Sequence, residues 1–157
     1  MPFVSVVLPT YNGKDYIGRS IQSVLGQTFS DFELIIIDDA STDDTGRVVR
    51  QFMHKDERVV YVKNEMNLGI QKTLNRGLRL EKGKYVVRID DDDIWAEKDK
   101  IARQIKFLED NPDYVLVGTG TIIVNEEGKE LFRFLSPEKD EDVRKKFIAC
   151  LEVGLIP

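Results

Sequence analysis

Short apolar runs alternate with helix-spaced apolar residues along this chain, and this alternation limits its fold more than any other feature. Residues 34–37 are wholly apolar and end at Asp38, as expected of a parallel strand buried on both faces. The next segment carries Val48, Val49 and Phe52 at helical spacing. Repeated strand–helix units predict an α/β fold, with a doubly wound, mostly parallel sheet inside an α/β/α sandwich.

The same patterns give approximate positions for every element. We expect strands at residues 3–8, 34–37, 59–62, 85–89 and 114–117, and a hairpin that pairs 122–124 with 131–134. The first strand should stop at Pro9, where a backbone donor is lost. Helical stripes cover residues 17–25, 48–52, 70–78, 101–108 and 140–151.

Composition excludes several classes of protein. The longest apolar run, residues 147–151, is too short to cross a membrane, and no secretory leader is visible. A net charge of −5 argues against a nucleic-acid partner. With His54 and Cys150 as the only residues of their types, an internal disulfide is excluded, the composition argues against a zinc site, and any metal must be held mainly by oxygen. We expect a cytoplasmic protein.

Ligands of doubly wound sheets bind at the carboxyl ends of the strands, and here those positions are rich in carboxylates. The strand at 85–89 runs directly into four consecutive aspartates, residues 90–93. Asp90 and Asp92 could hold a hard divalent ion such as Mn²⁺ or Mg²⁺, which binds carboxylate oxygens and substrate phosphates. The alternative is that the acidic run is solvated and only caps the helix that follows. No glycine-rich dinucleotide or P-loop motif is present.

Five motifs occur in an order that is more specific than any one of them. They are the segment 4–12 ending in Pro-Thr-Tyr-Asn, Ser-Val-Leu at 23–25 with Gln-Thr at 27–28, the strand with Asp-Asp-Ala-Ser-Thr-Asp at 34–43, Asn-Leu-Gly at 67–69 within 67–77, and Asp-Asp-Asp-Asp-Ile-Trp at 90–95. Together they span most of residues 3–110. This ordered set resembles the family-2 glycosyltransferases, whose GT-A fold is a Rossmann-like α/β sandwich.

The resemblance implies a donor-binding region at residues 1–110 and the incomplete start of an acceptor-side region at 111–157. It implies metal binding by the D-x-D residues Asp90 and Asp92. The nucleotide-binding residues that it implies are Pro9, Thr10, Tyr11, Asp38, Asp39, Asn67, Gly69, Lys72 and Asp91. Asp39 would accept a hydrogen bond from the base, with Asp38 beside it, and Lys72 would serve the phosphates.

Each of these residues also has a purely structural interpretation. Tyr11 could pack at the start of a helix, and Asp38 could brace the turn that follows it. Asn67 and Gly69 could simply shape the start of the next helix. Arg88 could serve only to neutralise the neighbouring acids.

The implied reaction is the inverting transfer of a sugar from a nucleotide-diphosphate sugar, with UDP the commonest nucleotide among relatives, to a saccharide or lipid-linked acceptor in polysaccharide biosynthesis. We find no match for the catalytic base and expect it beyond Pro157. The full enzyme would lie at the inner face of the membrane, and the apolar segment 147–156 would drive self-association. The alternatives are a non-catalytic nucleotide-sugar-binding module and a phosphoacceptor receiver domain, which would need a lysine where Gly118 follows the fifth strand.

Overall fold

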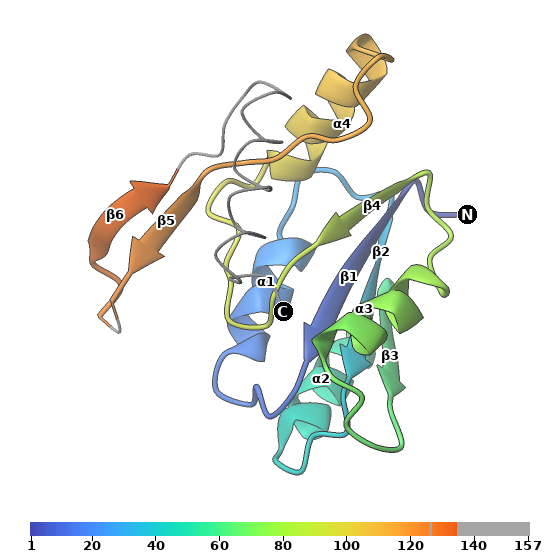
Figure 1. Ribbon diagram of the computed structural model, residues 1–157, viewed down its shortest axis with the longest axis vertical. Helices are drawn as coiled ribbons and strands as arrows, with labels where there is room; N and C mark the ends of the chain where they lie inside the picture. The colour runs from blue at the N-terminus through green and yellow to red at the C-terminus, as the bar shows by residue number, and fades with distance from the viewer. Residues whose placement is uncertain (126, 135–157) are drawn as a thin grey trace, which may run out of the picture. The chain divides into compact units, whose positions relative to one another are not determined.

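The computed structural model describes residues 1–125 and 127–134 of the chain (Figure 1). The first compact unit, Met1–Lys106, is built on a parallel sheet of order β3-β2-β1-β4, and the second is Phe107–Pro157. The strands of the sheet are β1 Val4–Thr10, β2 Phe32–Asp38, β3 Val59–Lys63 and β4 Tyr85–Arg88. The helices are α1 Ile17–Leu25, α2 Thr45–Met53, α3 Ile70–Leu78 and α4 Lys100–Asp110, and the second unit contains β5 Thr121–Val124 and β6 Glu130–Phe134.

The centre of the sheet is the most apolar part of the chain. All seven residues of β1 and all seven of β2 are buried, which confirms the prediction of strands covered on both faces. The predicted stop at Pro9 is wrong, because β1 continues to Thr10 and Pro9 pairs with Ile37. The pairing of β1 with β4 ends at Val7 and Arg88, so the missing amide of Pro9 costs no hydrogen bond on that side.

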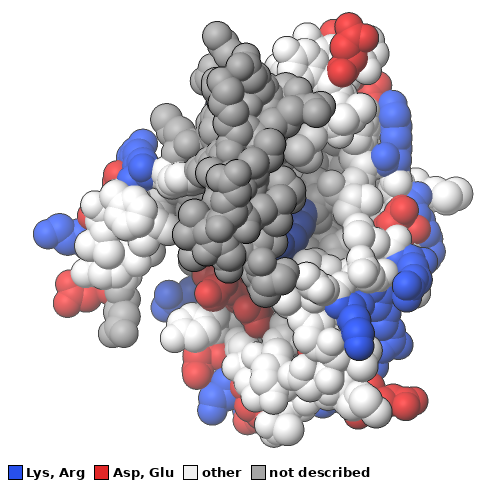
Figure 2. All heavy atoms as spheres, viewed as in Figure 1, with Lys and Arg blue, Asp and Glu red and all other residues white. Residues whose placement is uncertain are grey.

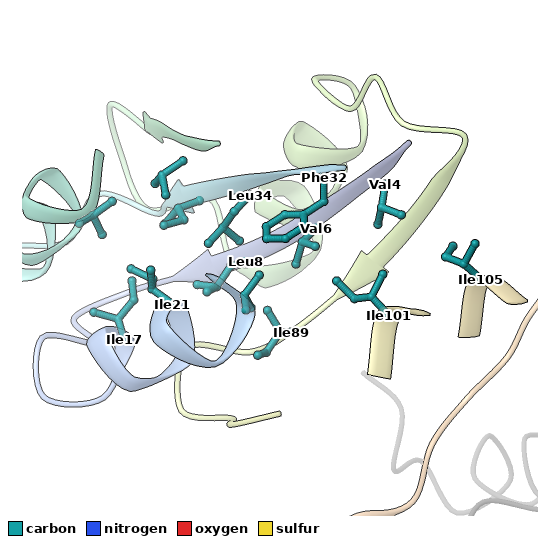
Figure 3. Packing of buried hydrophobic residues seen from close by; sticks show 14 residues of the cluster. Val4, Val6, Leu8, Ile17, Ile21, Phe32, Leu34, Ile89, Ile101 and Ile105 are labelled. Atoms are coloured by element: carbon teal, nitrogen blue, oxygen red, sulfur yellow. The ribbon is translucent and has the colours of Figure 1, made fainter. Parts of the chain in front are cut away.

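Helices cover both faces of this sheet, as the α/β/α prediction requires. On one face, inward residues of β1 and β2 pack against apolar residues of α1, α2 and α4 (Figure 3). This cluster comprises Val4, Val6, Leu8, Ile17, Ile21, Val24, Phe32, Leu34, Ile36, Val49, Val59, Ile89, Ile101 and Ile105. On the opposite face α3 lies against Val7 and Ile37, which alternate with the clustered residues along their strands.

The strand order creates a switch point beside β1. The chain first adds β2 and β3 on one side of β1 and then crosses over, through α3, to add β4 on the other side (Figure 1). The loops after β1 and β4 lead to α1 and α4 on one face, whereas the loop after β3 leads to α3 on the other, and such a divergence leaves a crevice above the sheet. This crevice is where the motif-bearing loops lie.

The second unit contains the predicted hairpin. β5 and β6 pair antiparallel, and the Asn125 side chain accepts hydrogen bonds from the amides of Glu127 and Lys129 in the turn. The strand predicted at residues 114–117 is wrong: the segment is not regular structure, and the Tyr114 ring packs edge-on against Phe107 instead. An apolar run forms a strand only where a partner edge is available, and no described strand pairs with it.

Other predictions fall outside the described residues. The helix at 140–151, the apolar end at 147–156 and Cys150 belong to this part of the chain. Over the residues that the structure does describe, none of the helices combines the length and apolar character that a bilayer crossing requires.

Candidate functional site

A cleft of about 500 Å³ opens at the carboxyl ends of the strands, within the first unit. Segments distant in sequence meet there: the end of β1, the end of β2, the start of α3 and the acidic loop after β4. The residues that line it are Pro9, Thr10, Tyr11, Asp39, Asn67, Gly69, Ile70, Thr73, Arg88, Asp90, Asp91 and Asp92. Of the eleven predicted site residues, nine line the cleft, and Asp38 and Lys72 lie outside it.

Asp39, which follows β2, is held in place by three donors from the loop between β3 and α3. Its carboxylate accepts hydrogen bonds from the Asn64 side chain at 2.7 Å and from the amides of Leu68 and Gly69, each at 2.8 Å. Burial alone would raise the pKa of Asp39, but these hydrogen bonds outweigh it and leave the pKa below its ordinary value. The cleft therefore contains a fixed, ionised acceptor.

Asp38 is placed differently from its neighbour. Its side chain is fully buried, and its carboxylate accepts hydrogen bonds from the Ser41 amide and the Tyr61 hydroxyl. Asp39 lines the cleft, whereas Asp38 does not. This geometry supports the alternative in which Asp38 braces the turn that follows it.

The loop after β1 is tied to the loop after β2. The Asn12 amide donates to Ser41 Oγ at 2.9 Å, and Asn12 Oδ1 accepts from the Thr42 amide at 2.9 Å. Asn12 has a positive φ of 55° and Ala40 one of 64°, a conformation that is costly for residues other than glycine. Tyr11 remains about half exposed and lines the cleft, so part of its ring is available to a ligand.

The acidic loop contains carboxylates in three different states. Arg88 forms a two-pronged ion pair with Asp90, with nitrogen–oxygen distances of 2.7 and 2.9 Å. Asp92 is exposed to the cleft and has no hydrogen bond or ion pair within the described residues. Burial, followed by the charges of Asp90 and Asp92, raises the pKa of Asp93. This crowding of negative charge favours a bound cation.

Asp91 is turned toward the loop after β1. It accepts a hydrogen bond from Thr10 Oγ1 at 2.5 Å, and its backbone carbonyl accepts one from Ser20 Oγ at 2.7 Å. Burial and then the charge of Asp92 raise the pKa of Asp91, against the lowering effect of the Thr10 hydrogen bond. Asp91 therefore lines the cleft, but its carboxylate already accepts a hydrogen bond from within the chain.

Three residues that shape the cleft were not predicted from the sequence. Ile70 and Thr73 line it from α3, and Asn64 is buried and links Asp39 to Thr73. Asn64 follows β3 directly, so the strand-end rule could have identified it. Lys72 is exposed and does not line the cleft, because its neighbour Thr73 occupies the inward face of α3. Figure 2 shows acidic side chains gathered near the middle of the view.

Residues 5–152 match the family described as glycosyl transferase family 2. The chain belongs to this family. The resemblance drawn from the ordered motifs is thereby confirmed, and the receiver-domain alternative is excluded. Over 156 residues the chain is 36% identical to TuaG of Bacillus subtilis, a glycosyltransferase assigned by name to teichuronic acid biosynthesis. That match covers 97% of this chain and 61% of TuaG.

A second family-2 relative carries a more specific name. WfaP of Escherichia coli, named as a UDP-Glc:alpha-D-GlcNAc-diphosphoundecaprenol beta-1,3-glucosyltransferase, is 39% identical over 109 residues, which are 69% of this chain and 42% of WfaP. The chain therefore spans less than two thirds of the length of these relatives.

Solved structures confirm the GT-A fold. The S. aureus protein TarS in complex with UDP aligns with a TM-score of 0.66 and 30% identity, over 71% of this chain and 33% of that one. The mannosyltransferase PcManGT from Pyrobaculum calidifontis, in complex with GDP-Man and Mn²⁺, also gives 0.66, with 31% identity over 70% of this chain and 33% of that one.

Proposed function

We propose that the cleft binds the nucleoside diphosphate part of a nucleotide sugar, and that this chain is the donor-binding part of an inverting glycosyltransferase. The observation that carries the proposal is that one cleft contains two carboxylates with different surroundings. Asp39 is ionised and fixed by backbone and amide donors, whereas Asp92 is exposed and without a partner among the described residues. One end of the cleft suits a base, and the other suits a cation on phosphates.

The nucleoside end is formed by Pro9, Thr10 and Tyr11 with Asp39. A half-exposed tyrosine ring offers a stacking surface, and a fixed carboxylate accepts a hydrogen bond from an N–H of the base. Uracil and guanine both carry such a group. UDP is bound by TarS and GDP-Man by PcManGT, and we take a UDP-sugar as the donor of this chain.

A divalent cation fits the other end of the cleft. Within the described residues no three metal-ligating side chains form a preformed site. An exposed carboxylate beside other acids is nevertheless the donor set that Mg²⁺ or Mn²⁺ uses when phosphates complete its shell. Asp92 would hold the ion, with Asp90 available if Arg88 releases it. Bound there, the ion would neutralise the charge that develops on the leaving diphosphate.

The residues of this chain would bind and orient the donor so that its sugar projects from the cleft. Transfer also requires a base that removes the proton of the acceptor hydroxyl. The relatives are longer than this chain, and we assign the base and the surface for a saccharide or lipid-linked acceptor to that additional length.

Calorimetric titration with UDP, GDP and dTDP, each with Mn²⁺ and with a chelator, tests the proposal. We expect one nucleotide to bind best and its affinity to fall when the metal is removed. Failure of all three to bind, or equal affinity with and without metal, would contradict it. Comparing sugar transfer by this chain and by a version extended past Pro157 distinguishes an enzyme from a non-catalytic binding module.

A further inference from the structure

The Asp91 side chain joins the loops that follow two neighbouring strands, β1 and β4. Thr10, at the end of β1, donates its hydroxyl proton to Asp91 Oδ2 at 2.5 Å. Ser20, on α1, donates to the Asp91 backbone carbonyl at 2.7 Å. The acidic loop is thus fastened at two atoms of one residue to the β1–α1 segment.

The β1–α1 loop leaves room for this carboxylate at Gly13. A Cβ added to Gly13 would collide with Asp91 Oδ2 and lie 2.8 Å from Thr10 Oγ1. The absence of a side chain at residue 13 and the presence of a carboxylate at residue 91 therefore fit each other. Neighbouring Asp92 has no such attachment within the described residues and faces the cleft.

We propose that Asp91 is a positioning residue, which latches the acidic loop onto the β1–α1 loop through Thr10 and Ser20 and so holds Asp92 at the cleft. The consequence for ligands rests on the proposed function, because it concerns the metal-bound diphosphate. The latch itself does not depend on any ligand. It also reassigns the Thr10 hydroxyl from nucleotide contact to loop contact.

Direct nucleotide contact by Thr10 and Asp91 is the competing explanation, and Ser20 distinguishes the two. Ser20 is fully buried and does not line the cleft, so its hydroxyl cannot touch a nucleotide there. Under direct contact, removing this hydroxyl leaves affinity unchanged. Under the latch, it loosens the acidic loop and lowers affinity.

The single tryptophan of the chain reports on the loop without any ligand. Trp95 follows the acidic run, is partly buried, and its amide donates to Ser23 Oγ at 3.1 Å. We expect Ser20→Ala and Thr10→Val each to raise acrylamide quenching of Trp95 about twofold, because a freed loop exposes the indole more often. Ser5→Ala is the matched control, since it also removes a fully buried hydroxyl, at the opposite end of β1.

Unchanged quenching in both latch variants, or an equal rise in Ser5→Ala, would overturn the latch. The second measurement is UDP affinity with Mn²⁺, where Ser20→Ala should weaken binding about fivefold and Ser5→Ala should not. The double variant Thr10→Val with Asp91→Ala should lose no more affinity than the worse single variant, since Asp91→Ala already removes the acceptor of the Thr10 hydroxyl. Additive losses would instead indicate direct contacts. If the unmutated chain binds no nucleotide, the proposed function fails, and quenching still decides the latch.

Discussion

The two ends of the parallel sheet use similar polar residues in opposite ways. At the amino end, Ser5 donates to Glu33 at 2.6 Å, and the amides of Lys82 and Gly83 donate to this pair. At the carboxyl end, Asp39 is also satisfied, but Asp92 has no partner within the described residues. At the amino end, backbone amides satisfy the polar side chains. At the carboxyl end, the Asp92 carboxylate stays available for a ligand.

The topology explains the difference. At the amino end, the segment before β4 crosses directly over Ser5 and supplies amides to it. At the carboxyl end, the loop after β3 leads to α3 on one face of the sheet while those after β1 and β4 lead to the other face, and the cleft opens where they separate. We infer that the polar residues at the amino end maintain stability, and that the residues that line the cleft at the carboxyl end also maintain binding.

The largest expected effect is on stability. Glu33→Ala should lower the free energy of unfolding by about 3 kcal/mol, because the Ser5 hydroxyl and the Lys82 amide lose a buried acceptor. Urea denaturation measures this loss. Nucleotide affinity of the folded protein should stay unchanged, and a parallel loss of affinity would break the division between the two ends.

The next effect is on metal-dependent binding. Asp92→Asn should weaken UDP binding in Mn²⁺ about tenfold, ~1.4 kcal/mol, because a neutral amide is a poor ligand for the ion. The fold should be unaffected, since Asp92 is exposed. Calorimetry with metal and with chelator provides the measurement, and full metal dependence in the variant would contradict the assignment of Asp92.

A smaller effect separates the two adjacent aspartates. Asp39→Asn should weaken UDP binding about fivefold, ~1 kcal/mol, even in chelator, because the lost charge faces the base and not the phosphates. Asp38→Asn is the matched control. It should lower stability, through Tyr61 and Ser41, without changing affinity. The reverse pattern would move the base contact to Asp38.

The smallest effect is a change in acid sensitivity. Because the pKa of Asp39 is lowered in the folded chain, the unfolded chain binds more protons near the ordinary value of 3.8. Stability from this carboxylate is therefore present above that pH and is lost as the pH falls below it. Denaturation at pH 5 and pH 3 should show a shallower loss for Asp39→Asn than for the unmutated chain, and equal losses would contradict the lowered pKa.

Sequence reasoning succeeded where local pattern and burial agree. The apolar runs of β1 and β2 and the helical stripes of α1 to α4 identified the sheet and its covering helices. It failed at residues 114–117, where an apolar run has no partner strand among those described. Within the site, the sequence could not show which of Asp38 and Asp39 lines the cleft, because that depends on the direction of each side chain after β2. The sequence also could not show that Thr10 donates a hydrogen bond to Asp91, since the two are 81 residues apart.

The strand order also sets the order in which the cleft can form. β1, β2 and β3 pair with neighbours close in sequence. β4 pairs with β1, so the chain must return past β3 and β2 to reach it. Closing that long loop costs chain entropy before the contacts of β4 compensate for it. The acidic loop comes directly after β4, so it reaches Thr10 only once this last pairing is made. A chain emerging from the ribosome would therefore acquire its Asp39 pocket first and its acidic loop last.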